Sequence, residues 1–410
     1  MAWGATGHFT LIAVAAGCLP APTPPSPRFL LHRHLVTEAF VAHRFGAHDA
    51  SRYLSLLRVP DAWATRPDEH WLFLKNGSWP NAALRSSLLA FAGCGPTLKT
   101  RTGGSCVRGG VEVLRGAREA HNAALRFDAG PVLWGLAGLT SPAHPATELL
   151  LARSAPLNGS LATDATTYPR LGYRAEGCVE RREGKDGCEY DGRLSLAASG
   201  GRAFLYARAN TNPRGGGRHV QVARLRRGAW SPFAPVKFAR GAEPPYDVLG
   251  DGRRATESAD IYYAAVDANP ADEATLLGLF PTVVAEAGRD GAAILAAVSC
   301  DGAHFSPPEP LLNSSHVGGE IVDHVVDGLA RDGDDVLIFV HAGVPGTAEK
   351  ACAYKALFPK PGVKSVKRAA PTGWRPPPSE VVGLRVPLAN LRRFTDRARA
   401  HLPGCRGAPT

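Results

Sequence analysis

Short apolar runs joined by glycine turns recur along the middle of the chain. Copies of this pattern begin at Asn122, Arg193 and Asp327. In each copy, a first apolar run is followed by a turn containing glycine and then by a second run rich in β-branched or aromatic residues. Two apolar runs around a short glycine turn are typical of a β-hairpin. The pattern therefore predicts at least three hairpins, each preceded by a polar or acidic residue.

A fourth unit of the same kind lies between the second and third copies. It runs from Asp260 to Val266, turns at Asn269-Pro270, and continues over 275–281 and 292–298. When one hairpin unit recurs along a chain, radial repetition in a β-propeller is the economical explanation. We therefore expect an all-β propeller over residues 111–350. The residue ahead of each blade would then point toward one central axis, where distant parts of the sequence meet.

The flanking regions have different patterns. Apolar residues recur at helical spacing over 30–57 until Pro60, which predicts a partly helical N-terminal extension over 21–110. Its histidines are expected to be solvated or core residues rather than metal ligands. At the other end, 361–378 is Pro-rich and basic and predicts a surface loop, while 386–402 predicts a short amphipathic helix. Residues 351–410 are thus expected to pack on the propeller.

Composition narrows the class of protein. The 410 residues are 44% hydrophobic and 20% charged, which is enough to bury a large core and excludes general disorder. The formal net charge is +10, but the basic residues are spread along the chain. We therefore expect no nucleic-acid partner, and attraction to an acidic or sulfated glycan stays open.

The first 20 residues have the features of a signal peptide. Phe9–Cys18 is apolar but too short to span a bilayer, and residues 1–8 contain no Lys or Arg. No other segment is long and apolar enough to cross a membrane. Glycosylation sequons begin at Asn76, Asn158 and Asn313. Together these features predict a secreted protein or one in the lumen of the secretory pathway.

The eight cysteines suggest disulfides, although pairing cannot be deduced from sequence alone. Cys94 with Cys106, and Cys178 with Cys188, are close in sequence and flanked by Gly-rich segments, as in loop-closing disulfides. A bond from Cys352 to Cys405 could attach the C-terminal tail. Cys300 would then remain as a small buried hydrophobic residue. None of the spacings is typical of a zinc site.

The phrases also carry a family resemblance. Polar residues before strands, Asp-Gly or Gly-Gly turns, and the Ser299–Phe305 phrase (Ser-x-Asp-Gly-x-His-aromatic) resemble five-bladed propeller glycosidases of the arabinanase, invertase and levansucrase superfamily. The likeness covers about 118–346. It implies five blades and a glycoside hydrolase, with a carboxylate from each of the first three blades meeting at the axis. One protonated and one ionised carboxyl are needed because glycoside cleavage passes through an oxocarbenium-like state.

Carried over to this chain, the resemblance implies a set of site residues. The implied catalytic residues are Asp191, Glu257, Asp260 and Asp327, and the implied substrate-binding residues are His121, Asn122, Arg193 and His324. Arg208, near Gly215–Gly217, is a further substrate-binding candidate, because a guanidinium matches the oxygens of a carboxylated or sulfated sugar. Asn122 stands where the family has its first-blade Asp, and Arg193 stands at the second-blade Asp, with Asp191 two residues earlier on the same strand face. Neither a metal nor a cofactor is expected.

Other interpretations of these residues stay open. Asp191 and Asp327 could instead cap turns, and Glu257 could lie on a surface loop. The arginines around Gly215–Gly217 could be solvated, or they could approach a carboxylated or sulfated sugar. We expect a monomer that hydrolyses a glycosidic bond of an oligo- or polysaccharide. The alternatives are a propeller that binds glycans without cleaving them, which Asn122 favours, and a protein-interaction propeller.

Overall fold

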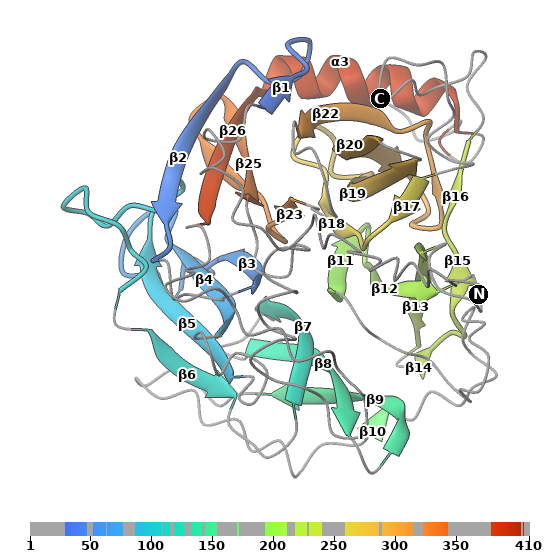
Figure 1. Cartoon of the computed structure of the whole chain (residues 1–410), viewed down its shortest axis with the longest axis horizontal. Coiled ribbons are helices and arrows are strands. Elements are labelled where there is room, and N and C mark those ends of the chain that lie inside the picture. The colour runs from blue at the N-terminus through green and yellow to red at the C-terminus, as the bar shows by residue number, and fades with distance from the viewer. Residues whose placement is uncertain are drawn as a thin grey trace, which may run out of the picture.

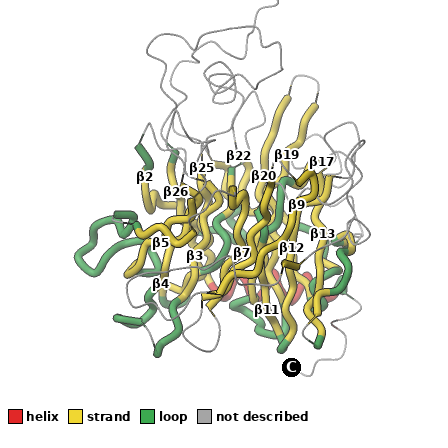
Figure 2. Tube along the Cα trace, turned by 90° about the horizontal axis from the view of Figure 1, so that it is seen from below, coloured by secondary structure: helices red, strands yellow, loops and turns green. Residues whose placement is uncertain are grey.

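The structure is a computed structural model, and its strands form five sheets around a central axis (Figure 1). It describes residues 29–46, 52–62, 64–76, 87–108, 110–114, 119–127, 133–141, 144–153, 170–171, 193–210, 218–227, 229–239, 259–286, 289–314, 323–342, 379–402 and 405. When the molecule is seen from below the view of Figure 1, the long axes of strands from different sheets lie roughly along one common line (Figure 2). This arrangement confirms the predicted propeller.

The first three sheets are built from consecutive stretches of the chain. Sheet 1 consists of β3 (Arg52–Arg58), β4 (His70–Asn76), β5 (Ser87–Cys94) and β6 (Val111–Leu114). Sheet 2 consists of β7 (Glu119–Phe127), β8 (Leu133–Ser141), β9 (His144–Arg153) and β10 (Arg170–Leu171). Sheet 3 consists of β11 (Ser195–Ser199), β12 (Arg202–Asn210), β13 (Arg218–Arg226), β14 (Ala229–Trp230) and β15 (Ala234–Pro235). Each begins with its innermost strand.

The last two sheets each combine one N-terminal strand with strands from the second half of the chain. Sheet 4 consists of β16 (Lys237–Phe238), β17 (Ala259–Ile261), β18 (Ala265–Ala268), β19 (Leu276–Glu286), β20 (Arg289–Ser299), β21 (His304–Phe305), β22 (Glu309–Ser314) and the N-terminal β1 (Phe29–Leu31). Sheet 5 consists of β23 (His324–Val325), β24 (Ala330–Asp332), β25 (Asp335–Ala342), β26 (Glu380–Pro387) and the N-terminal β2 (Glu38–Arg44). Because β2 pairs with β26, the two ends of the chain close the ring.

The prediction of a helical N-terminal extension was wrong for the described residues. The segment 30–57 contains β1, β2 and the beginning of β3, and sheet 1 follows directly. In β3, side chains on both faces of the strand are buried. Four consecutive residues are therefore all buried, namely Tyr53, Leu54, Ser55 and Leu56. Such a run cannot be distinguished from a helix by periodicity alone, and pairing with distant strands decides its structure. The hairpin phrases of the sequence are sheets 2 to 5, and the expected extension supplies sheet 1.

Among the side chains that the structure describes, three apolar cores lie between neighbouring sheets. One joins sheets 4 and 5 to the helix α3 (Leu388–Ala400), a second joins sheets 3 and 4, and a third joins sheets 5 and 1. The helix buries Leu391, Phe394 and Ala398, a spacing that puts all three on one face. Its other face carries arginines, of which Arg399 pairs with Asp272. The predicted C-terminal helix is therefore confirmed.

Two disulfides are present among the described residues. Cys94 bonds to Cys106, as predicted. Cys405 bonds to Cys300 rather than to Cys352, so the prediction that Cys300 is an unbonded core residue was also wrong. The reason is spatial: Cys300 follows β20, which α3 packs against, and Cys405 lies just beyond the end of that helix. The expected pair Cys178–Cys188 lies outside the described residues.

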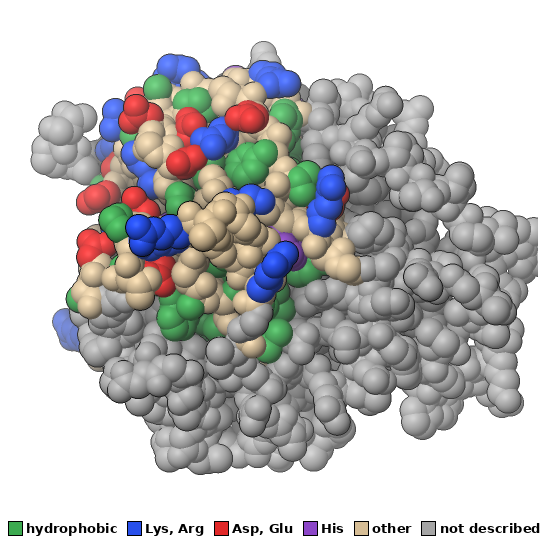
Figure 3. All heavy atoms as spheres, turned by 90° about the vertical axis from the view of Figure 1, so that its left-hand side faces the viewer, with side chains coloured by type: hydrophobic (Ala, Val, Ile, Leu, Met, Phe, Trp, Pro, Cys, Tyr) green, Lys and Arg blue, Asp and Glu red, His purple; other side chains and the backbone are tan. Residues whose placement is uncertain are grey.

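The face formed by β2, β4 and β5 carries both signs of charge. Lys and Arg side chains are interspersed with Asp and Glu across it (Figure 3). Arg385 illustrates the pattern, with ion pairs to Glu38 at 3.3 Å, Asp332 at 2.8 Å and Asp335 at 3.1 Å. Among the side chains coloured in this view, the basic ones alternate with acidic ones rather than forming a continuous basic patch. Among the described residues, no helix has the length and apolar character that crossing a membrane requires.

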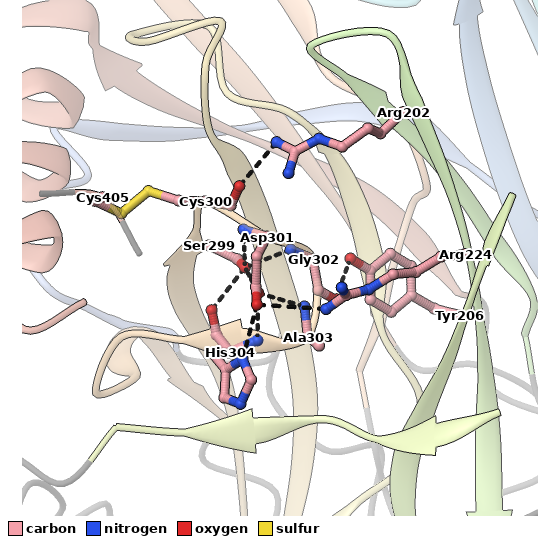
Figure 4. Close-up of polar contacts among 10 residues, drawn as sticks. All are labelled: Arg202, Tyr206, Arg224, Ser299, Cys300, Asp301, Gly302, Ala303, His304 and Cys405. Carbon is pink, nitrogen blue, oxygen red and sulfur yellow. Dashed lines mark hydrogen bonds and ion pairs between the residues drawn. A yellow bond between two sulfur atoms is a disulfide. The ribbon is translucent and has the colours of Figure 1, made fainter. Parts of the chain in front are cut away.

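The segment Ser299–Phe305 forms a turn of sheet 4 that makes polar contacts with sheet 3 (Figure 4). The hydroxyl of Tyr206 donates to the carbonyl of Gly302 at 2.8 Å, and Arg224 pairs with Asp301 at 3.3 Å. Although burial acts in the opposite direction, hydrogen bonds from the side chain and amide of His304 and from the amide of Ala303 lower the pKa of Asp301 to about 2. The motif behind the family resemblance thus has a structural role.

Replacing Gly302 by Ala tests this turn. Gly302 has φ +78°, and a Cβ there would lie 2.3 Å from Cε1 of Phe204. Gly333 is a matched control, since its φ is +62° and nothing would lie within 4 Å. Gly333→Ala should lose about 1–2 kcal/mol of unfolding free energy through backbone strain, and Gly302→Ala a further ~1–3 kcal/mol through overpacking. Urea denaturation measures both, and equal losses would contradict the proposed packing.

Candidate functional site

The innermost strands of the five sheets surround the axis (Figure 1). Their neighbours around the ring are in contact: β3 with β7, β7 with β11, β11 with β18, and β23 with β3. Tyr53 and Ser55 belong to β3, and Arg193 comes just before β11, whose first residue is Ser195. Asp327 lies between β23 and β24. These residues come from sheets 1, 3 and 5.

A buried ion pair lies on the axis. Nη2 of Arg193 is 3.3 Å from Oδ2 of Asp327, and the two side chains are 0% and 8% exposed. The same guanidinium donates a hydrogen bond to the hydroxyl of Ser55. Ser195 donates to Oδ1 of Asp327 at 2.7 Å and accepts from the amide of Val266 at 2.9 Å. This network joins sheets 1, 3, 4 and 5 through four side chains and one backbone amide.

Backbone pairing holds Asp327 in place. The amide of Leu56 donates to the carbonyl of Asp327 at 2.7 Å, and the amide of Asp327 donates to the carbonyl of Leu54 at 3.0 Å. The next residue, Gly328, has φ +103°, and a Cβ there would lie 1.9 Å from the carbonyl oxygen of Leu56. Only glycine fits that approach. The Asp-Gly pair of the sequence phrase is therefore explained by the contact between sheets 5 and 1.

A second carboxyl interacts electrostatically with Asp327. Burial raises the pKa of Asp267 from 3.8 to about 6, and the negative charge of Asp327 adds to the rise. The amides of Ala268 and Leu329 and the charge of Arg126 act in the opposite direction. Burial also raises the pKa of Asp327, against the effects of Arg193 and Ser195. The axis therefore holds one carboxyl that is paired with a cation and another that resists ionisation.

Aromatic rings stack beside the ion pair. The ring of His324 lies 5.2 Å from that of Tyr53 at an interplanar angle of 10°, and 5.5 Å from that of Tyr262 at 29°. The guanidinium of Arg208 lies 5.4 Å from the centre of the Tyr262 ring, within range of a cation–π interaction. Tyr263 meets His324 edge-on at 5.6 Å and donates its hydroxyl to the carbonyl of Val325. Four sheets contribute to this stack.

Tyr53 has an unusual backbone conformation. Its φ is +52°, a value that is uncommon outside glycine and unfavourable for a bulky residue. Such strain is found at functional sites, where the surrounding structure maintains it. Here it accompanies the placement of the Tyr53 ring against His324, while Ser55 two residues later reaches Arg193.

The structure brings together four of the residues singled out from the sequence. Arg193, Arg208, His324 and Asp327 are all buried around the axis. Asp260 is on β17, opposite Val283, and Asn122 is on β7, opposite Gly138. The pairing shifts between Ala120 and Asn122, which leaves His121 as an irregularity of the strand. Only the backbone of these last three candidates is described. Asp191 and Glu257 lie outside the described residues.

Sequence reasoning missed several residues of the axis. They are Tyr53, Ser55, Ser195, Tyr262, Tyr263 and Asp267. Strand alternation could have identified Ser195, two residues after Arg193. Tyr53 and Ser55 were hidden by the helical interpretation of their segment. Within the described part of the chain, no cluster of His, Cys, Asp and Glu is arranged to hold a metal ion.

Comparison with solved structures finds carbohydrate-active enzymes. An N-acetylgalactosamine deacetylase from F. plautii, in complex with blood group B trisaccharide, is 13% identical with a TM-score of 0.47, over 92% of this chain and 100% of its own. The GH93 α-L-arabinofuranosidase of Fusarium graminearum is 9% identical with a TM-score of 0.42, over 83% and 94%. An α-L-arabinanase of Penicillium chrysogenum is 10% identical with a TM-score of 0.42, over 88% and 99%.

The last two of these structures are an arabinofuranosidase and an arabinanase. No family model matches the chain, and no curated protein has a significantly similar sequence. Since every TM-score given above is below 0.5, the fold assignment rests on the five sheets themselves.

Breaking the axial ion pair should destabilise the protein strongly. Asp327→Asn leaves the guanidinium of Arg193 buried without its counter-charge, and removing one partner of a buried pair costs about 3–5 kcal/mol. Glu380→Gln is the control, because its pair with Arg44 is largely exposed at the arginine and should contribute only about 0–1 kcal/mol. Urea denaturation at pH 7 compares the two. Losses of similar size would show that the axial pair is not a central support.

Asp267 should give the protein a specific pH dependence. The pKa of Asp267 is about 6 in the folded protein, against 3.8 ordinarily. As the pH rises, Asp267 therefore ionises in the unfolded chain before it ionises in the folded protein. Stability is then lost between about pH 4 and pH 6, by up to ~3 kcal/mol. Asp267→Asn should remove this loss, so its stability relative to wild type should increase over that interval. Urea denaturation at pH 4, 5, 6 and 7 tests this, and a difference independent of pH would contradict it.

Proposed function

We propose that the chain binds a carbohydrate at the axis of the propeller and hydrolyses one of its glycosidic bonds. One observation carries this proposal: guanidinium, carboxyl and aromatic side chains from different sheets converge at one place. Sites that bind small molecules combine apolar or aromatic walls with a few convergent polar groups. The matches to carbohydrate-active enzymes are in line with the proposal but do not carry it.

The catalytic carboxyls of this proposal come from the residues ahead of two inner strands. Asp191 precedes β11, Glu257 precedes β17, and Asp260 is within β17. Glycoside hydrolysis needs two carboxyls, one on each side of the bond, about 5–10 Å apart. Asp327 was also proposed as catalytic from the sequence. Since both of its oxygens are engaged by Arg193 and Ser195, we assign it to holding the site together.

A second candidate function is binding without cleavage. The engagement of Asp327 favours it, as does Asn122 at a position where the related glycosidases have an Asp. The third candidate, a protein-interaction platform, would call for an axis filled by apolar side chains. The described part of the axis is occupied by Arg193, Asp327 and Ser195. This arrangement favours a site for a polar ligand.

We also propose that the protein is exported and monomeric, and that it carries glycans at its sequons. The disulfides Cys94–Cys106 and Cys300–Cys405 support export, since such bonds persist in oxidising compartments.

The function is tested with the purified chain, aryl glycosides and a panel of plant and algal polysaccharides. We expect hydrolysis of at least one substrate, and a loss of about 10²–10⁴-fold in kcat for Asp191→Asn, Glu257→Gln or Asp260→Asn, because general acid–base catalysis contributes that much. Asp332→Asn, which changes a surface ion pair, serves as the control and should keep full activity. Full activity in all three variants would overturn the catalytic assignment. Binding without hydrolysis would establish the second candidate function.

A further inference from the structure

The guanidinium of Arg193 is only partly used by the protein. An arginine has five N–H groups, one on Nε and two on each terminal nitrogen. The two on Nη2 have two acceptors, Ser55 and Asp327. Nε and Nη1 are buried and have no hydrogen-bond partner within the described part of the chain. A buried cationic donor without an acceptor is costly, so a group that accepts from these atoms would stabilise the site.

A second guanidinium makes the site more positive. Arg208 is buried at 5% exposure and lies over the ring of Tyr262 at 5.4 Å. Tyr262 stacks on His324, and Tyr263 lies edge-on to the same histidine. The charge of Arg193 acts on Tyr263. Arg193 and Arg208 therefore lie around one set of rings.

This arrangement determines which sugar would fit. Resting on the proposed function, we infer that the bound sugar is anionic, and that Nε and Nη1 of Arg193 donate hydrogen bonds to its carboxylate or sulfate oxygens. Charge-assisted hydrogen bonds of this kind are about twice as strong as neutral ones. Burial strengthens them further, because the local dielectric is low. Tyr262 is the partly exposed member of the ring stack, so it is the ring that a sugar could contact first.

The experiment compares matched ligands with the same sugar backbone, one with its acidic groups charged and the other with those groups esterified or removed. The wild-type chain is titrated calorimetrically with trigalacturonate and its fully methyl-esterified form, and with a sulfated galactan oligosaccharide and its desulfated form. At 50 mM NaCl we expect the anionic member of at least one pair to bind ten times or more tightly than its neutral partner. This preference should shrink at 300 mM NaCl through screening. The pair that shows it distinguishes a carboxylate from a sulfate.

Variants then assign the preference to residues. Arg193→Gln should reduce the preference for the anionic ligand to less than threefold, and Arg208→Gln should reduce it in part. Arg44→Gln, at an exposed arginine paired with Glu380, should leave it unchanged. The wild-type comparison remains decisive if Arg193→Gln does not fold.

The outcomes separate this inference from the proposed function. Equal binding of charged and neutral partners, or tighter binding of the neutral ones, overturns the anionic-sugar inference and leaves a carbohydrate site standing. A preference that survives Arg193→Gln overturns the assignment to Arg193. If neither these ligands nor any neutral glycan of the panel binds, both the inference and the proposed function fail.

Discussion

The ion pair between Arg193 and Asp327 is the interaction on which the rest of the molecule depends. It lies where the inner strands meet, and its partners Ser55 and Ser195 belong to sheets 1 and 3. A buried charge is tolerated only when it is paired and hydrogen-bonded. The four side chains must therefore keep their relative positions, and those positions fix how sheets 1, 3 and 5 are arranged. The outer strands can vary far more, because their charged side chains pair in water at the surface.

Closure of the ring follows from the same requirement. Asp327 can face Arg193 only while its backbone is held against β3, and Gly328 permits that approach. Sheet 5, which carries Asp327, is completed by β2 from the other end of the chain. The N-terminal strands therefore contribute indirectly to the geometry of the axis. The Cys300–Cys405 bond attaches the end of the chain, beyond α3, to the turn that joins sheets 3 and 4.

Structural features that depend on local and repeated sequence patterns could be predicted from the sequence. Features that depend on contacts between distant segments could not. Hairpins starting near Asn122, Arg193 and Asp327 could be identified because a glycine turn between apolar runs is a local signal. The first strand of sheet 1 was missed because the run around Tyr53 is buried on both faces and has no strand periodicity. The segments 71–74 and 88–92, which lie in β4 and β5, were compatible with either strands or short helices. The partner of Cys405 depends on how α3 packs on β20, which spacing cannot reveal. Arg193 and Asp327 could be identified as candidates because each begins a hairpin pattern. Their ion pair could not be predicted, because it joins distant segments of the chain.

The ion pair between Arg193 and Asp327 also indicates that stability and catalysis depend on different residues around the axis. If Asp327 were a free catalytic carboxylate, Arg193 would be buried without its counter-charge, so stability and catalysis would compete at one residue. Assigning catalysis to residues ahead of the inner strands of sheets 3 and 4 removes this conflict. It also leaves Arg193 with donors that Asp327 does not use. The ion pair that links sheets 1, 3 and 5 thus also supplies the positive charge on which the proposed ligand contact depends.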